Sequence, residues 1–121
     1  MSGSAQSIET YASIIEKMKE MIDLHNIWLD APEAGCQAGF TDRSLSKWGF
    51  AGDRVERSIF VNATLVKANF ARAELMGSDF FAADLTMANF SHADLRKVAF
   101  CGAQLSGAIF DHANLEDADF R

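Results

Sequence analysis

The sequence is poor in the residues that mark several large classes of protein. Its 121 residues include only one proline and two cysteines, Cys36 and Cys101. Neither cysteine belongs to a CxxC pair or has a pair of histidines nearby. We therefore expect two free thiols, and the sequence predicts neither a disulfide framework nor a zinc site.

Long apolar runs and an excess of basic residues are missing too. No apolar run approaches the roughly 18 residues of a membrane-spanning helix, and residues 1–6 lack the cationic start of a secretory signal. The net charge of -6 excludes a basic nucleic-acid-binding surface. We therefore expect a single-domain cytoplasmic protein that binds no nucleic acid and no membrane. We also expect a bacterial origin.

A five-residue period runs from Phe40 to Phe120. Every fifth residue alternates between Phe and Leu, and Val55 is the one departure. From Ser58 onward, the residue two places earlier is Ala or Ser in every unit except at Val98. These two positions are called the core position and the small position.

A period of five fits neither regular element. It advances a helix by about 140°, and it places successive core residues on opposite faces of a strand. The chain must therefore turn once per unit, as one side of a stacked coil. The large core residue and the small residue then point inward, and the other three point outward.

The alternation of Phe with Leu indicates how many sides a coil has. A three-sided coil would stack Phe over Leu, whereas a four-sided coil stacks like on like at the inter-strand spacing of about 4.8 Å. The sequence therefore predicts an all-β solenoid of about four coils, in which each buried core residue contributes roughly 1.5 to 3 kcal/mol. The predicted ladders are Phe60, Phe80, Phe100 and Phe120; Phe70, Phe90 and Phe110; Leu65, Leu85 and Leu105; and Leu75, Leu95 and Leu115.

Several units resemble a known consensus. Residues 83–87 (ADLTM), 93–97 (ADLRK) and 113–117 (ANLED) resemble the A(D/N)LXX repeat of pentapeptide-repeat proteins. The resemblance covers about two thirds of the chain, and it implies the family's right-handed, four-sided parallel β-helix over residues 58–121. Before Ser58 the small position holds Arg43, Trp48 and Asp53. We therefore expect residues 31–57 to form an irregular first coil.

Residues 7–30 have the pattern of an amphipathic helix. Ile8, Ile15, Ile22 and Leu29 are spaced seven apart on one stripe, while acidic residues occupy the opposite face. An uncovered solenoid end exposes unpaired backbone and apolar core, so we expect this helix to serve as an N-terminal cap, preceded by disordered residues 1–6. Residues 24–29 also resemble the segment that precedes the first coil in some pentapeptide-repeat proteins.

Two features leave room for self-association. The helix either caps the solenoid only, or also pairs with another protomer through residues such as Ile15 and Ile22. At the other end, Phe120 and Arg121 leave the last coil open, so that either the repeat continues in a longer protein or another copy covers it. A homodimer through the C-terminal coil or the N-terminal helix is therefore one expectation.

The sequence offers little catalytic chemistry. It has no nucleophile paired with a base, no glycine-rich phosphate loop and no metal-ligand spacing, and the predicted core holds Phe, Leu and Ala. His92 and His112 should stack beside Asp111, and such a pair either binds a metal weakly or is simply solvated. We favour the second, and expect no catalytic residue, no cofactor and no metal.

The outward residues differ from side to side. The side that contains Phe60, Phe80 and Phe100 displays apolar residues, whereas the side that contains Leu75, Leu95 and Leu115 displays mostly charged ones. Exposed apolar clusters tend to mark contacts. The candidate interface residues are Val61, Phe81 and Cys101 on the apolar side, together with Ile15, Ile22 and Phe120; the alternative is that the helix folds over the apolar side.

These features favour a non-enzymatic protein–protein interaction or scaffold module whose partner the sequence does not identify. The resemblance allows a second function, modulation of DNA gyrase by imitation of DNA. Four coils span only about 19 Å, and the net -2 of residues 38–121 is far below one charge per roughly 1.7 Å of duplex DNA. Length and charge thus argue against mimicry. A third alternative is a detached domain of a larger protein.

Overall fold

The computed structural model describes the backbone from Gly3 and the side chains from Ala12 onward, to Arg121. The chain forms two compact units, Met1–Gln37 and Ala38–Arg121. The first contains the helix α1 (Gly3–Asp30), and the second contains the repeat. Among the residues described, no helix is both long and apolar enough to cross a membrane.

Helix α1 begins earlier than the sequence predicted. It includes residues 3–6, which we expected to be disordered, and Ala5 and Gln6 are good helix formers. Met1 and Ser2 lie outside the described residues. The N-terminal helix itself is present as predicted.

The segment after α1 folds back on the last turns of the helix. The N–H of Ala31 continues the helical pattern by donating to the Ile27 carbonyl at 2.7 Å, and the N–H of Cys36 then donates back to the Leu24 carbonyl at 3.1 Å. A Cβ at Gly35 would overlap the backbone nitrogen of Trp28, so the close return of the chain requires glycine there.

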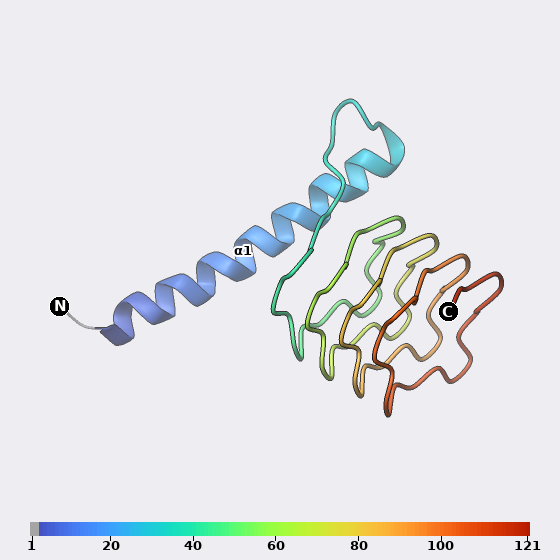
Figure 1. The fold of residues 1–121 in the computed structure, drawn as a ribbon. Helices are drawn as coiled ribbons and strands as arrows, with labels where there is room; N and C mark the ends of the chain where they lie inside the picture. Colours follow the sequence, from blue (N-terminus) through green and yellow to red (C-terminus); the bar gives the residue numbers. More distant parts are fainter. Residues whose placement is uncertain (1–2) are drawn as a thin grey trace. The chain divides into compact units, whose positions relative to one another are not determined.

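The second unit is a solenoid of coils stacked in the order of the sequence (Figure 1). Parallel bridges join residues twenty positions apart, from Gly39 with Ile59 to Ala99 with Asp119. Each coil therefore consists of four five-residue sides, as the alternation of Phe with Leu predicted. The bridges are isolated contacts between neighbouring coils, because the chain turns after every unit.

The five positions of a unit are named small, Asx, core, outer and corner, in chain order. In residues 83–87, the core and corner N–H groups donate to the next coil, and the Asx N–H donates to the previous coil. The small N–H donates to the core carbonyl of the preceding unit, and the outer N–H donates to the Asp84 carboxylate. The donor–acceptor distances are 2.8 Å for the core and corner N–H groups, 2.9 Å for the Asx N–H, 3.0 Å for the small N–H and 3.1 Å for the outer N–H. Every backbone donor of this unit thus has an acceptor.

The core consists of stacked rings. The rings of Phe60 and Phe80 lie 4.7 Å apart and nearly parallel, whereas Phe70 meets Phe60 edge-on at 5.7 Å. Both arrangements are favourable for aromatic pairs. Burial is complete along the predicted ladders as far as Phe100, and then decreases: Leu105, Phe110 and Leu115 are half-buried, and Phe120 is 48 % exposed.

The corner residues share an unusual backbone conformation. Every corner from Asp42 to Asp117 has a positive φ between 56° and 73°, although only four of them are glycine. Each corner is the third residue of a turn closed by a bond from the next small N–H to the core carbonyl, such as Ala63 N to Phe60 O at 3.1 Å. A positive φ at that place is typical of a type II turn.

The first coil is regular in its backbone, so the prediction of an irregular coil was wrong on this point. Ser44, Gly49 and Arg54 each form the same bridge to the following coil as later Asx residues do. Arg43 is exposed and Trp48 is half-buried, so these side chains do not fill the interior. The first coil pairs with another coil of the solenoid on one side only, and the long side chains of Arg43 and Trp48 at its small positions do not enter the core.

Candidate interaction surface

The outer positions of one side of the solenoid form a continuous apolar row. This side, called the apolar side, has Phe40, Phe60, Phe80, Phe100 and Phe120 at its core positions. The N–H of Asn62 donates to the Phe81 carbonyl at 2.8 Å, and the N–H of Ala82 donates to the Cys101 carbonyl at 3.0 Å. These bonds place Val61, Phe81 and Cys101 on successive coils.

Phe81 lies at the centre of this row and is its most exposed member. The residue is 53 % exposed, while Val61 and Cys101 are half-buried. Next to it, the Asp79 carboxylate accepts a hydrogen bond from the Phe81 N–H at 2.9 Å. The row therefore presents an aromatic ring beside one fixed carboxylate.

Polar groups lie at both ends of the row along the solenoid axis. In the first coil, Asp42 Oδ1 accepts a hydrogen bond from the Asn62 side chain at 2.7 Å. In the last coil, the Arg121 guanidinium forms an ion pair with Asp119 at 2.7 Å. Hydrogen bonds from Arg121 hold the pKa of Asp119 well below its usual range. The apolar row thus runs between an acidic end and an end that carries a cation.

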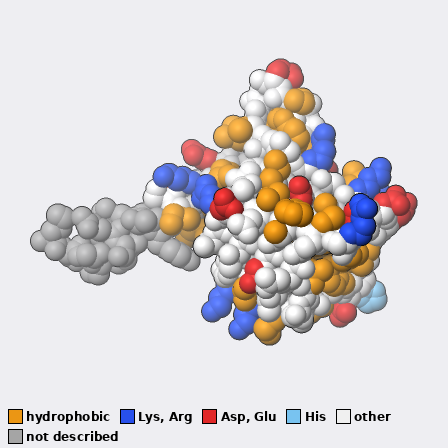
Figure 2. All heavy atoms as spheres, viewed as in Figure 1, with side chains coloured by type: hydrophobic (Ala, Val, Ile, Leu, Met, Phe, Trp, Pro, Cys, Tyr) orange, Lys and Arg blue, Asp and Glu red, His pale blue; other side chains and the backbone are white. Residues whose placement is uncertain are grey.

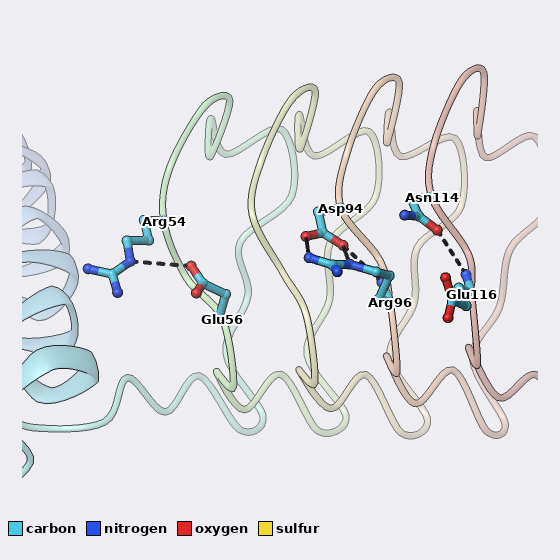
Figure 3. A network of polar contacts seen from close by, with 6 residues as sticks. All are labelled: Arg54, Glu56, Asp94, Arg96, Asn114 and Glu116. Atoms are coloured by element: carbon cyan, nitrogen blue, oxygen red, sulfur yellow. Dashed lines mark hydrogen bonds and ion pairs between the residues drawn. The ribbon is translucent and has the colours of Figure 1, made fainter.

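A second side, called the charged side, has Val55, Leu75, Leu95 and Leu115 at its core positions. Its outward residues are mostly charged, whereas those of the apolar row are not. Figure 3 shows the Asx and outer residues of three units on this side, with Arg54 directed toward Glu56, Arg96 toward Asp94, and Asn114 toward the backbone N–H of Glu116. Arg96 contacts Asp94 at 2.6 Å and lowers the pKa of that carboxyl mainly by hydrogen bonding, against a smaller opposing effect of burial. Arg54 lies 3.5 Å from Glu56. Two ion pairs thus form within units of this side, and Figure 2 shows Lys, Arg, Asp and Glu side chains at the surface of the face that it views.

The other candidate interface residues lie elsewhere. Ile15 and Ile22 belong to α1 in the first unit and are half-buried, whereas the exposed large apolar residues of α1 include Ile14, Leu24 and Ile27. Phe120 stacks on Phe100 at 5.0 Å and belongs to the open end of the core, not to the row. Of the predicted interface residues, the structure brings together Val61, Phe81 and Cys101.

The two stacked histidines lie on a third side. The rings of His92 and His112 are 4.8 Å apart and nearly parallel, as the spacing of twenty predicted. Within the described part of the chain, no group of three or more His, Cys, Asp or Glu residues could hold a metal ion. Both histidines are exposed.

The sequence reasoning missed two exposed apolar residues. Met87 at a corner is 53 % exposed, and Ile109 at an Asx position is 42 % exposed. A Cβ at Gly107 would lie 3.1 Å from Met87 Cγ, so the methionine lies over that glycine. A long corner residue with glycine twenty positions later is the signal that could have identified it.

Comparison with known proteins identifies the family. A model of pentapeptide repeats, in eight copies, matches residues 58–96 and 83–121. The protein belongs to the pentapeptide-repeat family.

Solved structures of this family are similar to the chain. A pentapeptide-repeat protein of the Arabidopsis thaliana thylakoid lumen is 39 % identical over 68 % of this chain, with a TM-score of 0.67. A pentapeptide-repeat protein from Nostoc PCC 7120 is 26 % identical, with a TM-score of 0.66, over 81 % of this chain and 82 % of its own. The matched part spans only 57 % of the Arabidopsis protein. No curated protein sequence matches.

Proposed function

We propose that this pentapeptide-repeat protein is a non-enzymatic interaction module that uses its apolar side to bind a protein partner. The observation that carries the proposal is the row of Val61, Phe81 and Cys101, with Phe81 53 % exposed at its centre. Exposed apolar clusters mark contacts, and large aromatic residues near the centre of an interface supply much of the binding energy.

The solenoid suits this role because it holds the row rigidly. The three outer residues sit on backbone that is hydrogen-bonded to both neighbouring coils, above core rings stacked about 5 Å apart. A rigid surface loses little conformational entropy on binding, which favours affinity for a given area.

The arrangement of polar groups argues for binding rather than catalysis. The solenoid interior holds Phe, Leu, Val and Ala with two buried serines, and the Ser78 hydroxyl is engaged with the Val55 carbonyl at 3.1 Å. On the charged side, Glu56 and Asp94 form ion pairs with arginines of their own units at the surface of the column. Catalysis needs a pocket in which such groups converge on a substrate.

Site-specific photo-crosslinking tests the proposal. Phe81 is replaced by the photoreactive p-benzoylphenylalanine, which resembles it in shape, in cells that produce the protein. Met87 is the matched control, because it is equally exposed on a different part of the solenoid. Adducts that form from position 81 and not from position 87 support the proposal. Equal adducts from both positions, or none from either, contradict it.

A further inference from the structure

Charge is distributed unevenly along the solenoid. Residues 38–77 contain six basic and four acidic residues, whereas residues 78–121 contain three basic and seven acidic residues. The first half is therefore net positive and the second half is net negative. The basic residues of 38–77 lie on the other three sides, so this difference acts on a neighbouring column only at long range, where it favours opposite directions.

The order of outer residues on the apolar side is nearly the same from either end. Along the axis it reads Thr41, Val61, Phe81, Cys101 and Arg121, so that Phe81 lies on the middle coil with one smaller apolar residue on each side. A two-fold axis through the middle coil, parallel to the chain direction of that side, would place Phe81 opposite Phe81, Val61 opposite Cys101, and Thr41 opposite Arg121.

From these two features we infer that the apolar side binds a second copy of this chain, with the solenoid axes antiparallel. The inference rests on the proposed function and names its partner. Phe81 then faces the partner's Phe81, and Val61 faces the partner's Cys101. Such an interface is isologous, as in most two-fold dimers.

The ends of the row are complementary in this arrangement. Asp42, at the corner of the first coil, comes beside the partner's Arg121, and the same contact forms twice. The side chain of Arg121 is 88 % exposed and also contacts Asp119 of its own chain. Exposed charge pairs at the rim add specificity and register more than affinity.

One contact opposes the dimer. Asp79 borders Phe81 on the middle coil and faces the partner's Asp79 across the two-fold axis. Like charges in apposition weaken association. The two carboxylates keep the complex weak, and we expect a dissociation constant in the micromolar range.

Three variants test the surface by sedimentation equilibrium. Phe81→Asp should raise the dissociation constant about 100-fold, because it removes the central aromatic contact and adds charge. Met87→Asp is the matched control, with the same exposure on another side, and should leave it unchanged. Asp79→Asn keeps the acceptor for the Phe81 N–H and should tighten the dimer. Circular dichroism spectra like that of the unmodified protein show that each variant is folded.

Disulfide trapping tests the orientation. With Cys36→Ser as background, Val61→Cys should form a cross-linked dimer with the partner's Cys101 under mild oxidation. Val66→Cys is the matched control, since Val66 holds the same outer position on the neighbouring side and is also half-buried. Its failure to cross-link is expected. Equal cross-linking of both variants, or of neither, overturns the antiparallel arrangement.

The results separate this inference from the proposed function. If the protein stays monomeric well above micromolar concentration, the inference that its partner is a second copy of this chain is wrong. The interaction module then still stands if photo-crosslinking at position 81 gives an adduct with a different protein. An adduct with the mass of two chains, together with a tighter Asp79→Asn dimer, supports both.

Discussion

At the scale of single residues, the corners carry the least favourable conformation in the fold. Most corner residues are not glycine, yet all have φ near +60°, a region that costs L-residues roughly 1 to 2 kcal/mol. The core residues supply the compensating free energy by complete burial. Replacing a corner residue with glycine should therefore stabilise the protein, whereas truncating a core residue should destabilise it.

Ala82→Gly should stabilise the protein by about 1 kcal/mol, because glycine adopts the left-handed region without a steric penalty. Ala82 is a corner residue with φ 58°. Urea denaturation measures the effect. The control is Ala83→Gly at the next, buried small position, which should destabilise. Loss of stability in both variants would show that corner strain is negligible.

Phe90→Ala should lower the free energy of unfolding by about 3 to 5 kcal/mol, because it leaves a cavity in the middle of the ladder. Phe90 is fully buried, and its ring stacks between those of Phe70 and Phe110. The same truncation at Phe120, which is half-exposed at the last coil, should cost far less. Thermal unfolding of both variants checks the difference. Equal losses would contradict the burial gradient.

At the scale of one five-residue unit, the Asx position completes the backbone hydrogen bonds. Its side chain accepts the N–H of the outer residue, as in Asn89 with Ser91 at 2.9 Å and Asp79 with Phe81 at 2.9 Å. This N–H points to neither neighbouring coil, so a side chain of Asp or Asn length is suited to reach it. The consensus A(D/N)LXX thus has a physical cause at its second position.

Replacing Ile109 by Asn should stabilise the protein by about 0.5 to 1 kcal/mol, because it supplies an acceptor at an Asx position and removes an exposed apolar side chain. Asn89→Ala should have the opposite sign, since it removes such an acceptor. Urea midpoints of both variants test the role of the position. Two changes of the same sign would refute it.

The pair of Asp94 and Arg96 predicts a specific response to pH. Arg96 lowers the folded-state pKa of Asp94, so the pair stabilises the protein above the unfolded pKa of about 3.9, and the contribution disappears as pH falls through the folded value. Arg96→Gln should therefore lower the urea midpoint slightly at pH 7. The difference from the unmodified protein should vanish in strong acid. A difference that persists there would point to lost packing instead.

At the scale of the whole molecule, the parts predicted from sequence are those that depend on a repeated contact. The Phe and Leu ladders follow from spacing alone, because only a coil of twenty residues places Phe60 on Phe80. The first coil was mispredicted because the rule for small residues holds only between two coils, and Trp48 lies in the first coil. The positive φ of the corners had no signal, since Lys67, Met87 and His92 share no property that indicates it.

The candidate site was predicted in part for the same reason. Grouping the outward residues that are twenty positions apart placed Val61, Phe81 and Cys101 on one side, because the register between coils is uniform. The exposure of each residue depends on its neighbours in the coils on both sides, which a single period does not describe. Met87 was therefore missed, and the pairing of Arg121 with Asp119 was seen only in the structure.

Because one five-residue unit forms one side of a coil, the number of residues in the chain decides which side each later unit occupies. An insertion or deletion of five residues keeps every unit intact, yet it rotates all later units by a quarter turn relative to the earlier ones. Phe81 would then leave the row of Val61, and Phe would lie on Leu at the junction. A change of twenty residues preserves both the faces and the ladders. An insertion or deletion of five residues can therefore change which outward side chains share a face of the column, without substituting any of them.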